Sequence, residues 1–257
     1  MLNQIDVQDI VTIAKEAGNA IMQVYKQDFK VEYKKDGSPL TLADKAANDV
    51  IEDGLNKLSV NLPILSEEGK EIPYEVRKHW EYFWLVDPLD GTKEFVKKNG
   101  EFTVNIALIH VDRPVLGVVY APALNICYWA KLGEGAFKDN QRLPINSNKD
   151  RKTCKILASR SHMSNETKEF IDSIKTSKEK ELISIGSSLK ICLVAEGEAD
   201  IYPRLGSTME WDTGAAHAIV SESGARMTRY KTHLSLRYNS GKSLLNPSFI
   251  VKMRDLD

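Results

Sequence analysis

The sequence has few cysteines and no long hydrophobic run, and both absences restrict the class of protein. Its three cysteines, Cys127, Cys154 and Cys192, are scattered and form no Cys-x-x-Cys pair. A sparse, odd-numbered set is typical of reduced thiols in the cytosol rather than of a disulfide framework. We see no signal peptide and no apolar run approaching about 18 residues. We therefore expect a cytoplasmic protein without a membrane-spanning helix.

An excess of charge of either sign is also missing. Lysine and arginine number 35 and aspartate and glutamate 36, which leaves a net charge of −1 at pH 7. No overall field would attract nucleic acid or a membrane surface, so we expect no nucleic-acid polymer as a partner. If the substrate is strongly anionic, metal ions or a few well-placed basic residues must attract it locally.

Hydrophobic patterning divides the 257-residue chain near residue 150. Apolar residues spaced by three and four predict an amphipathic helix over roughly residues 5–27, and the segment 102–128 is typical of an antiparallel meander. After the polar segment 144–153, strands and helices alternate, which indicates a layered α/β arrangement. We therefore expect an α/β (α+β) fold with an N-terminal half, 1–150, and a C-terminal half, 151–257.

The most informative stretch is WLVDPLDGT at 84–92. Its apolar start predicts a strand, and Pro88, which has no N–H for a sheet ladder, predicts that this strand ends near Asp87. A turn at Asp90 follows. Two carboxylates three residues apart can converge there on a divalent cation, or each can accept hydrogen bonds from the backbone of the turn. The stretch alone favours neither interpretation.

Further acids stand at the predicted ends of other elements. Glu67 follows a short apolar strand, 62–65. Asp44 lies three residues after Thr41 in a capping-box pattern, which explains it structurally and is compatible with a functional role as well. Asp212 precedes small residues at another helix start, where an N-cap is the ordinary alternative.

Taken together, the acids indicate a metal site with several carboxylate ligands. The set contains only oxygen ligands, without histidine or cysteine, and hard cations such as Mg²⁺ prefer such ligands. The candidate residues are Asp44, Glu67, Asp87, Asp90 and Asp212.

Basic residues of the second half are candidates for binding an anion. Lys190 falls in the first turns of a helix expected from Ser188, where the helix dipole disfavours a cation, so we infer an anionic group nearby. The alternative for Lys190 is a solvated charged face. His217, in an alanine-rich helix, is expected to be packed rather than to bind a ligand.

Three motifs resemble the signatures of the inositol monophosphatase superfamily, whose members are Mg²⁺-dependent, lithium-sensitive phosphomonoesterases. They are DPLDGT at 87–92, Glu67-Glu68 and WDTGAA at 211–216, in the expected order across nearly the whole chain. Many relatives read WDTAAG in the last motif, a difference that we expect to alter packing only. The resemblance implies a layered α-β-α-β-α sandwich with the site between the two halves.

Within that superfamily the chain is most similar to the bacterial 3′(2′),5′-bisphosphate nucleotidases. The segments that carry this resemblance are 91–95, 99–105, 159–162 and 186–190.

The resemblance implies two Mg²⁺ ions, and relatives show a third, weaker ion beside Glu67. Glu67, Asp87 and the Leu89 carbonyl would hold one ion. Asp87, Asp90 and Asp212 would hold the second, with Asp87 as the bridge. Of these residues, Glu67, Leu89, Asp90 and Asp212 would also contact the substrate.

The remaining roles also follow from the resemblance. Asp44 and Thr92, assisted by Glu67, would position and deprotonate the attacking water, and the backbone N–H groups at Gly91 and Thr92 would hold the phosphate, as helix N-termini do for anions. The nucleotide would contact Ser187, Lys190, Arg204 and His162. For Arg204 a solvated charged face is an equally good interpretation.

The expected reaction is hydrolysis of 3′-phosphoadenosine 5′-phosphate (PAP) to AMP and phosphate, with the sulfated analogue PAPS giving adenylyl sulfate, in sulfur assimilation or PAP recycling. An inositol monophosphatase or a related sugar phosphatase is the alternative, against which the segment 93–95 and the pair Ser187 and Lys190 argue. A non-catalytic nucleotide-binding regulator is a further alternative. Such a protein would not need to keep every acid of the site, whereas here all the candidate acids are in place.

A monomer and a homodimer are both compatible with the sequence. So are an enzyme free in the cytosol and one held loosely at the cytoplasmic face of the inner membrane, as some bacterial relatives are.

Overall fold

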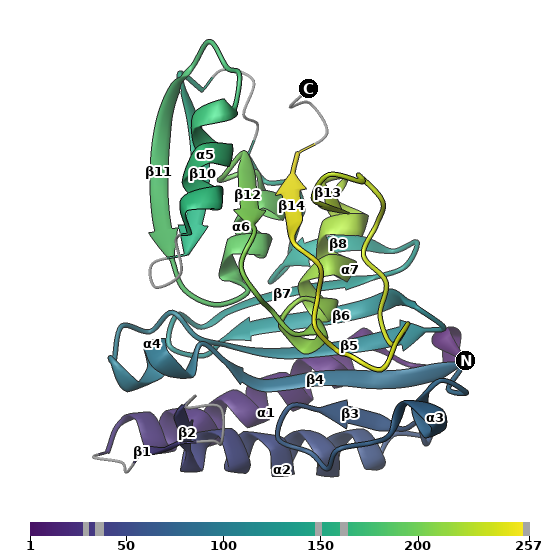
Figure 1. Cartoon of the computed structure of the whole chain (residues 1–257). Coiled ribbons are helices and arrows are strands. Elements are labelled where there is room, and N and C mark those ends of the chain that lie inside the picture. Colours follow the sequence, from purple (N-terminus) through teal and green to yellow (C-terminus); the bar gives the residue numbers. More distant parts are fainter. Residues whose placement is uncertain (28–30, 34–38, 147–150, 160–163, 254–257) are drawn as a thin grey trace.

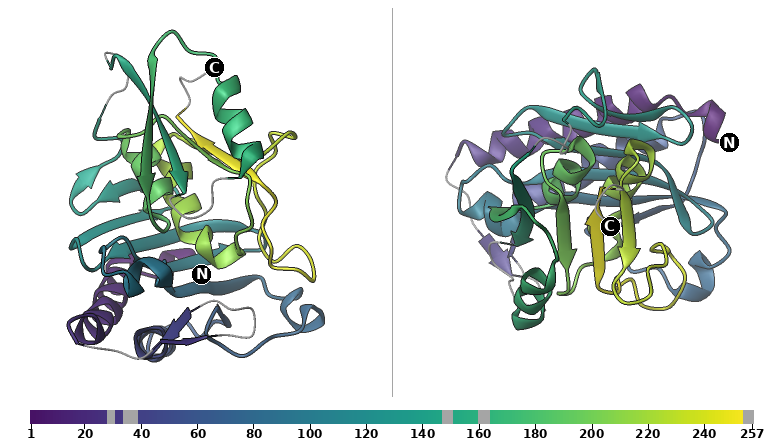
Figure 2. Two further views of the ribbon diagram at one scale, coloured as in Figure 1. Left: turned by 60° about the vertical axis from the view of Figure 1, so that its left-hand side comes forward. Right: turned by 90° about the horizontal axis from the view of Figure 1, so that it is seen from above.

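The described residues of the computed structural model are 1–27, 31–33, 39–146, 151–159 and 164–253. They form alternating layers of helices and sheets, which confirms the expected α-β-α-β-α sandwich (Figures 1 and 2). The layering follows from the sequence pattern, because each apolar sheet face and each apolar helix stripe must be covered by another layer.

The first layer contains two helices whose apolar faces lie on a seven-stranded sheet (Figure 1). Helix α1 (Val7–Tyr25) is the amphipathic helix expected over residues 5–27. Helix α2 (Leu42–Asn56) begins with the expected capping box between Thr41 and Asp44. The box pairs backbone N–H groups that the first turn cannot pair within the helix.

The seven-stranded sheet is an antiparallel meander with one parallel strand at its edge. Strand β3 pairs in parallel with β4, and each later strand pairs antiparallel with the one before it. The strands, in order across the sheet, are β3 (Ile64–Ser66), β4 (Tyr82–Asp90), β5 (Thr103–His110), β6 (Arg113–Ala121), β7 (Ile126–Lys131), β8 (Gly135–Lys138) and β9 (Gln141–Arg142). The short elements around it are η1 (Leu2–Gln4), β1 (Val31–Tyr33), β2 (Pro39–Thr41), α3 (Tyr74–Arg77) and α4 (Thr92–Val96).

Strand β4 does not end near Asp87, so that prediction is wrong; it continues through Pro88 to Asp90. Asp87 pairs with Asn105 and Asp90 with Thr103, so three steps along β4 match two steps along β5. The extra residue makes a β-bulge, which tolerates a proline because the ladder is interrupted there. In a regular strand, residues three apart face opposite sides of the sheet. The bulge therefore brings Asp87 and Asp90 to the same side.

The second sheet has five strands in the order β11-β10-β12-β14-β13, with parallel pairing around β10 and antiparallel pairing around β14. The strands are β10 (Thr153–Ser159), β11 (Glu179–Ile185), β12 (Ile201–Arg204), β13 (Arg226–Arg229) and β14 (Phe249–Lys252). Helix α5 (Asn165–Ser173) covers the outer face, where Phe170 and Ile171 pack on a buried cluster that includes Ile156 and Ile250.

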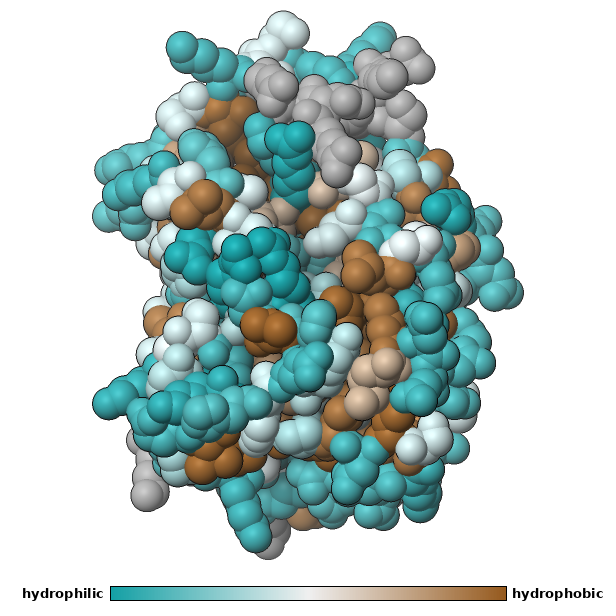
Figure 3. All heavy atoms as spheres, turned by 90° about the vertical axis from the view of Figure 1, so that its right-hand side faces the viewer, coloured by the Kyte–Doolittle hydropathy of each residue, from teal (hydrophilic) through white to brown (hydrophobic). Residues whose placement is uncertain are grey.

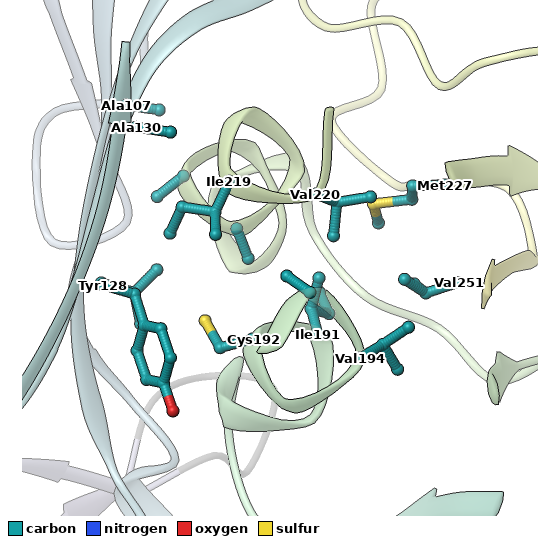
Figure 4. Packing of buried hydrophobic residues seen from close by; sticks show 14 of the residues in the cluster. Ala107, Tyr128, Ala130, Ile191, Cys192, Val194, Ile219, Val220, Met227 and Val251 are labelled. Atoms are coloured by element: carbon teal, nitrogen blue, oxygen red, sulfur yellow. The ribbon is translucent and has the colours of Figure 1, made fainter. Parts of the chain in front are cut away.

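Two helices lie between the sheets as the middle layer (Figure 4). Helices α6 (Leu189–Glu196) and α7 (Gly214–Ser223) are buried on nearly every side, as expected for helices covered by a sheet on each face. One hydrophobic cluster contains their side chains together with Tyr128 of the first sheet and Val251 of the second. The division near residue 150 separates the strands of the two sheets, and we keep it as a proposal because this cluster joins both halves.

Hydrophobic residues also reach the surface in places. On the face seen in Figure 3 they lie in groups bordered by hydrophilic residues. Among the described helices, none is both long enough and apolar enough to cross a membrane.

Candidate active site

Three carboxylates that are far apart in the sequence converge at one point. Oxygen atoms of Glu67, Asp87 and Asp212 all lie within 4.8 Å of one another. Strands β3 and β4 run in parallel, and the N–H of Glu67 donates to the carbonyl of Val86 at 3.1 Å. This bond fixes the loop after β3 beside the bulge of β4, so the two acids from the first sheet meet the one from the second half.

The electrostatics of this cluster fit a divalent cation. Burial, followed by the charges of Glu67, Asp90 and Asp212, raises the pKa of Asp87 well above its ordinary range. Burial and then the charge of Asp90 raise the pKa of Asp212 in the same direction. A cation would favour the charged form of each carboxylate, and an oxygen-only donor set suits Mg²⁺ or a similar hard ion.

Asp212 occupies a slightly different position from the one expected. It was expected to begin a helix, but it ends the short 3₁₀ helix η2 (Glu210–Asp212), and the N-cap of α7 is Thr213. Its carboxylate accepts a hydrogen bond from the N–H of Met209 at 2.9 Å. The Asp212 carboxylate is therefore held by the turn before α7 and lies at the edge of the cleft.

Asp90 and Leu89 complete this end of the cleft. The Asp90 carboxylate accepts a hydrogen bond from the N–H of Ser188 at 2.6 Å. Burial raises the pKa of Asp90, while the charge of Lys190 opposes that shift. Leu89 donates its N–H to Asp87 at 3.0 Å, and its carbonyl accepts from the hydroxyl of Thr92 at 3.3 Å.

Asp44 has both roles that the sequence left open to it. One carboxylate oxygen accepts from the N–H and the hydroxyl of Thr41, at 2.7 and 2.8 Å, which is the capping box. The other oxygen accepts from the hydroxyl of Thr92 at 3.3 Å. The cap holds the buried carboxylate still, so Asp44 can orient the hydroxyl of Thr92, which lines the cleft.

Gly91 links these residues through a backbone shape that favours glycine. Its φ is +91°, in the left-handed region, and a Cβ there would meet the carbonyl of Glu101 at 3.1 Å. Helix α4, which follows, has only five residues. A helix this short has a small dipole, so an anion at this point would depend on the individual N–H groups.

A cleft of about 290 Å³ extends from the carboxylates to basic residues of the second half. Lys190 is buried rather than solvated, and its ammonium donates to the carbonyls of Ile185 and Ser187 at 3.2 and 2.6 Å. Burial lowers the pKa of Lys190 to about 8, with Asp90 opposing the shift. Ser187, whose φ is +49°, also lines this wall.

Arg204 faces the same cleft from β12. It donates from Nη2 to the carbonyl of Ser207 at 2.7 Å, while its buried Nε has no hydrogen-bond partner among the described residues. Lys190 and Arg204 are therefore the cations of this wall. His162 lies outside the described residues.

His217 is packed, as expected. It is buried, its Nδ1 lies 2.9 Å from the hydroxyl of Tyr238, and burial lowers its pKa to about 4. Sequence reasoning missed Tyr202, whose ring lies 5.6 Å from the Lys190 ammonium, and gave no role to Asn105. Only the pairing of Asn105 with Asp87 points to it, and that pairing depends on strand register.

Comparisons with known proteins identify the family. A model described as the inositol monophosphatase family matches residues 3–255. The 3′(2′),5′-bisphosphate nucleotidase CysQ of Salmonella typhimurium is 48% identical over 249 residues, which cover 95% of this chain and 98% of that protein. The protein of the same name from Escherichia coli (strain K12) is 47% identical over 251 residues, 96% of this chain and 99% of that protein. The crystal structure of CysQ from Bacteroides thetaiotaomicron, at 43% identity, gives a TM-score of 0.87 and covers 98% of both chains. The chain therefore belongs to the inositol monophosphatase family.

Proposed function

We propose that the protein is a Mg²⁺-dependent 3′(2′),5′-bisphosphate nucleotidase that hydrolyses PAP to AMP and phosphate. The observation that carries this proposal is a single cleft lined by both acids and cations. The carboxylates of Glu67, Asp87 and Asp212 line it together with Lys190 and Arg204. A bisphosphate nucleotide carries two separate phosphates, one for a metal held by the acids and one for the cations. The names of the similar CysQ proteins support the same substrate class.

The acids would bind the metal. Glu67, Asp87 and the Leu89 carbonyl would hold one Mg²⁺, and Asp87, Asp90 and Asp212 a second. When bound, these ions would lower the pKa of a water molecule and neutralise the charge that develops on the departing ribose oxygen. The five carboxylates alone would repel a phosphate dianion, so both binding and turnover should require the cation.

Other side chains would orient the reactants. The Thr92 hydroxyl can accept a proton from the attacking water and donate its own to Asp44, with which it already lies in hydrogen-bond contact. The backbone at Gly91 would lie against the 3′-phosphate. Lys190 and Arg204 would hold the 5′-phosphate, which fixes the distance between the ribose oxygen and the acids.

We further propose that PAPS is a second substrate, which gives adenylyl sulfate, and that the enzyme acts in sulfur metabolism. Lithium should inhibit it by occupying a Mg²⁺ position. An inositol monophosphatase remains the alternative, but inositol 1-phosphate has no second phosphate for Lys190 and Arg204.

A phosphate-release assay tests the substrate. PAP, PAPS, inositol 1-phosphate and fructose 1,6-bisphosphate would be compared at equal Mg²⁺, and PAP should give the highest kcat/KM. Faster turnover of inositol 1-phosphate would refute the nucleotide assignment.

A second variant set tests the acids. Asp90→Asn should abolish turnover and leave the fold intact. Asp112→Asn, at the opposite end of β5 and paired with Arg237, is the matched control and should retain activity. Near-normal activity of Asp90→Asn would contradict the metal assignment.

A further inference from the structure

A buried polar group connects Asp90 to the helix that carries Lys190. Asn105, Thr103 and Ser188 are 1%, 0% and 3% exposed, so solvent does not reach their side chains and any hydrogen bonds they make are within the protein. Asn105 pairs with Asp87 across the β4–β5 ladder and Thr103 pairs with Asp90. Residues two apart on β5 share a face, so these side chains lie on the same side of the sheet as the two acids.

Ser188, which lines the cleft, contacts both Asn105 and Thr103 through its hydroxyl. Its hydroxyl donates to Oδ1 of Asn105 at 2.9 Å, and the hydroxyl of Thr103 lies 2.9 Å from the same Ser188 oxygen. Its backbone N–H donates to Asp90 at 2.6 Å. Ser188 precedes α6, so one residue contacts the strand face, the acid and the start of the helix.

The orientation of the Asn105 amide follows from these contacts. With Oδ1 turned to Ser188, Nδ2 is directed away from Ser188, and it is buried without a hydrogen-bond partner among the described residues. The contact between the two side chains therefore fixes the Ser188 hydroxyl against β5, next to the backbone N–H of Ser188 that donates to Asp90.

We propose that Ser188 and Asn105 are positioning residues that hold the Asp90 carboxylate for metal binding and couple it to the helix that carries Lys190. The Asn105 amide oxygen anchors the Ser188 hydroxyl, and the backbone N–H of the residue anchored in this way donates to Asp90. Neither residue needs to touch the phosphate. The inference rests on the proposed metal-dependent reaction and adds a determinant of metal affinity that no acid provides.

The test uses Ser188→Ala, which removes the hydroxyl and keeps the backbone N–H to Asp90. Binding of Mn²⁺ to the nucleotide-free protein would be followed by electron paramagnetic resonance. Loss of one hydrogen bond's contribution predicts about fivefold weaker binding, a lower kcat and a KM for PAP changed by less than about twofold. Ser223→Ala is the control, because it removes another buried serine hydroxyl, bonded to the Val220 carbonyl at the far end of α7, and should leave Mn²⁺ affinity unchanged.

A double-mutant cycle separates positioning from a general structural effect. If Ser188 acts through Asn105, then Ser188→Ala should have no further effect on Mn²⁺ affinity in an Asn105→Leu background. Additive effects, or unchanged affinity of Ser188→Ala while the wild type binds Mn²⁺, would overturn the inference and leave the proposed function standing. A wild-type protein that binds no divalent ion would overturn both.

Discussion

Gly117 in strand β6 offers a direct test of how packing controls the site. A Cβ at Gly117 would lie 2.2 Å from the carbonyl oxygen of Ala215, in the first turn of α7. An ordinary contact starts at 3.4 Å, so Gly117→Ala would have to push α7 from the sheet by about 1.2 Å. Both partners are backbone or rigidly attached to it, and no rotamer change can relieve the clash.

The expected loss of stability follows from that overlap. Overpacking a buried site of this kind lowers the free energy of unfolding by roughly 1–3 kcal/mol. The displacement also reaches Asp212, three residues before Ala215, and misplacing a catalytic group by about 1 Å can cost on the order of 100-fold in rate. We therefore expect a variant that folds, is less stable, and has lost most of its kcat.

The assay combines urea denaturation with PAP hydrolysis under conditions where the variant is fully folded. Gly241→Ala is the matched control, because a Cβ there meets nothing within 4 Å. Unchanged stability of Gly117→Ala would refute the packing argument. Reduced stability with full activity would refute the link between α7 and the position of Asp212.

Three further predictions follow from the site and the core. Removing divalent ions with EDTA and restoring Mg²⁺ to about 100 times its Kd should raise stability by about 2.7 kcal/mol and Tm by about 5–10 °C, measured calorimetrically, and no shift would contradict the metal site. In the unfolded chain His217 takes up a proton near pH 6.5, whereas burial lowers its pKa to about 4 in the folded state. The free energy of unfolding should therefore fall by about 3 kcal/mol as the pH drops from 6.5 to 4. Urea titrations of His217→Asn should show a smaller loss, and an equal loss would exclude the histidine as its source. Because burial lowers the pKa of Lys190 to about 8, kcat/KM for PAP should fall as pH rises through that value, and Lys190→Arg should keep its kcat/KM to higher pH; identical profiles would remove Lys190 from substrate binding.

Local patterns were sufficient to predict most elements of the fold. The spacing of apolar residues gave α1, and the capping box gave the start of α2, because both depend on neighbours within a few turns. The end of β4 was wrong because the bulge arises from pairing with β5, a contact remote in sequence. The start of α7 was displaced by two residues because a 3₁₀ turn, which has no strong signature, precedes it.

Some residues of the candidate site could be predicted from the sequence and others could not. The acids at the ends of helices and strands were predictable, because turns and helix starts have a characteristic residue composition. The burial of Lys190 was not, because it depends on the carbonyls of Ile185 and Ser187 turning inward and on Tyr202 arriving from another strand. Asn105 gives no local signal at all, since its place beside the acids is a consequence of strand register.

The convergence of the acids depends on the packing of the two sheets against each other. Asp87 belongs to the first sheet and Asp212 follows β12, the central strand of the second, so neither half contains the whole cluster. Helix α6 joins them at both ends: Ser188 at its start bonds to Asn105, and Glu196 at its end accepts from Tyr128 and Lys138, each at 2.7 Å. If α6 slid along the sheet, the buried carboxylate of Glu196 would lose one of these partners, and the protein would be strongly destabilised. The two contacts therefore fix the position of the helix. The convergence of the carboxylates is therefore maintained by contacts at both ends of α6.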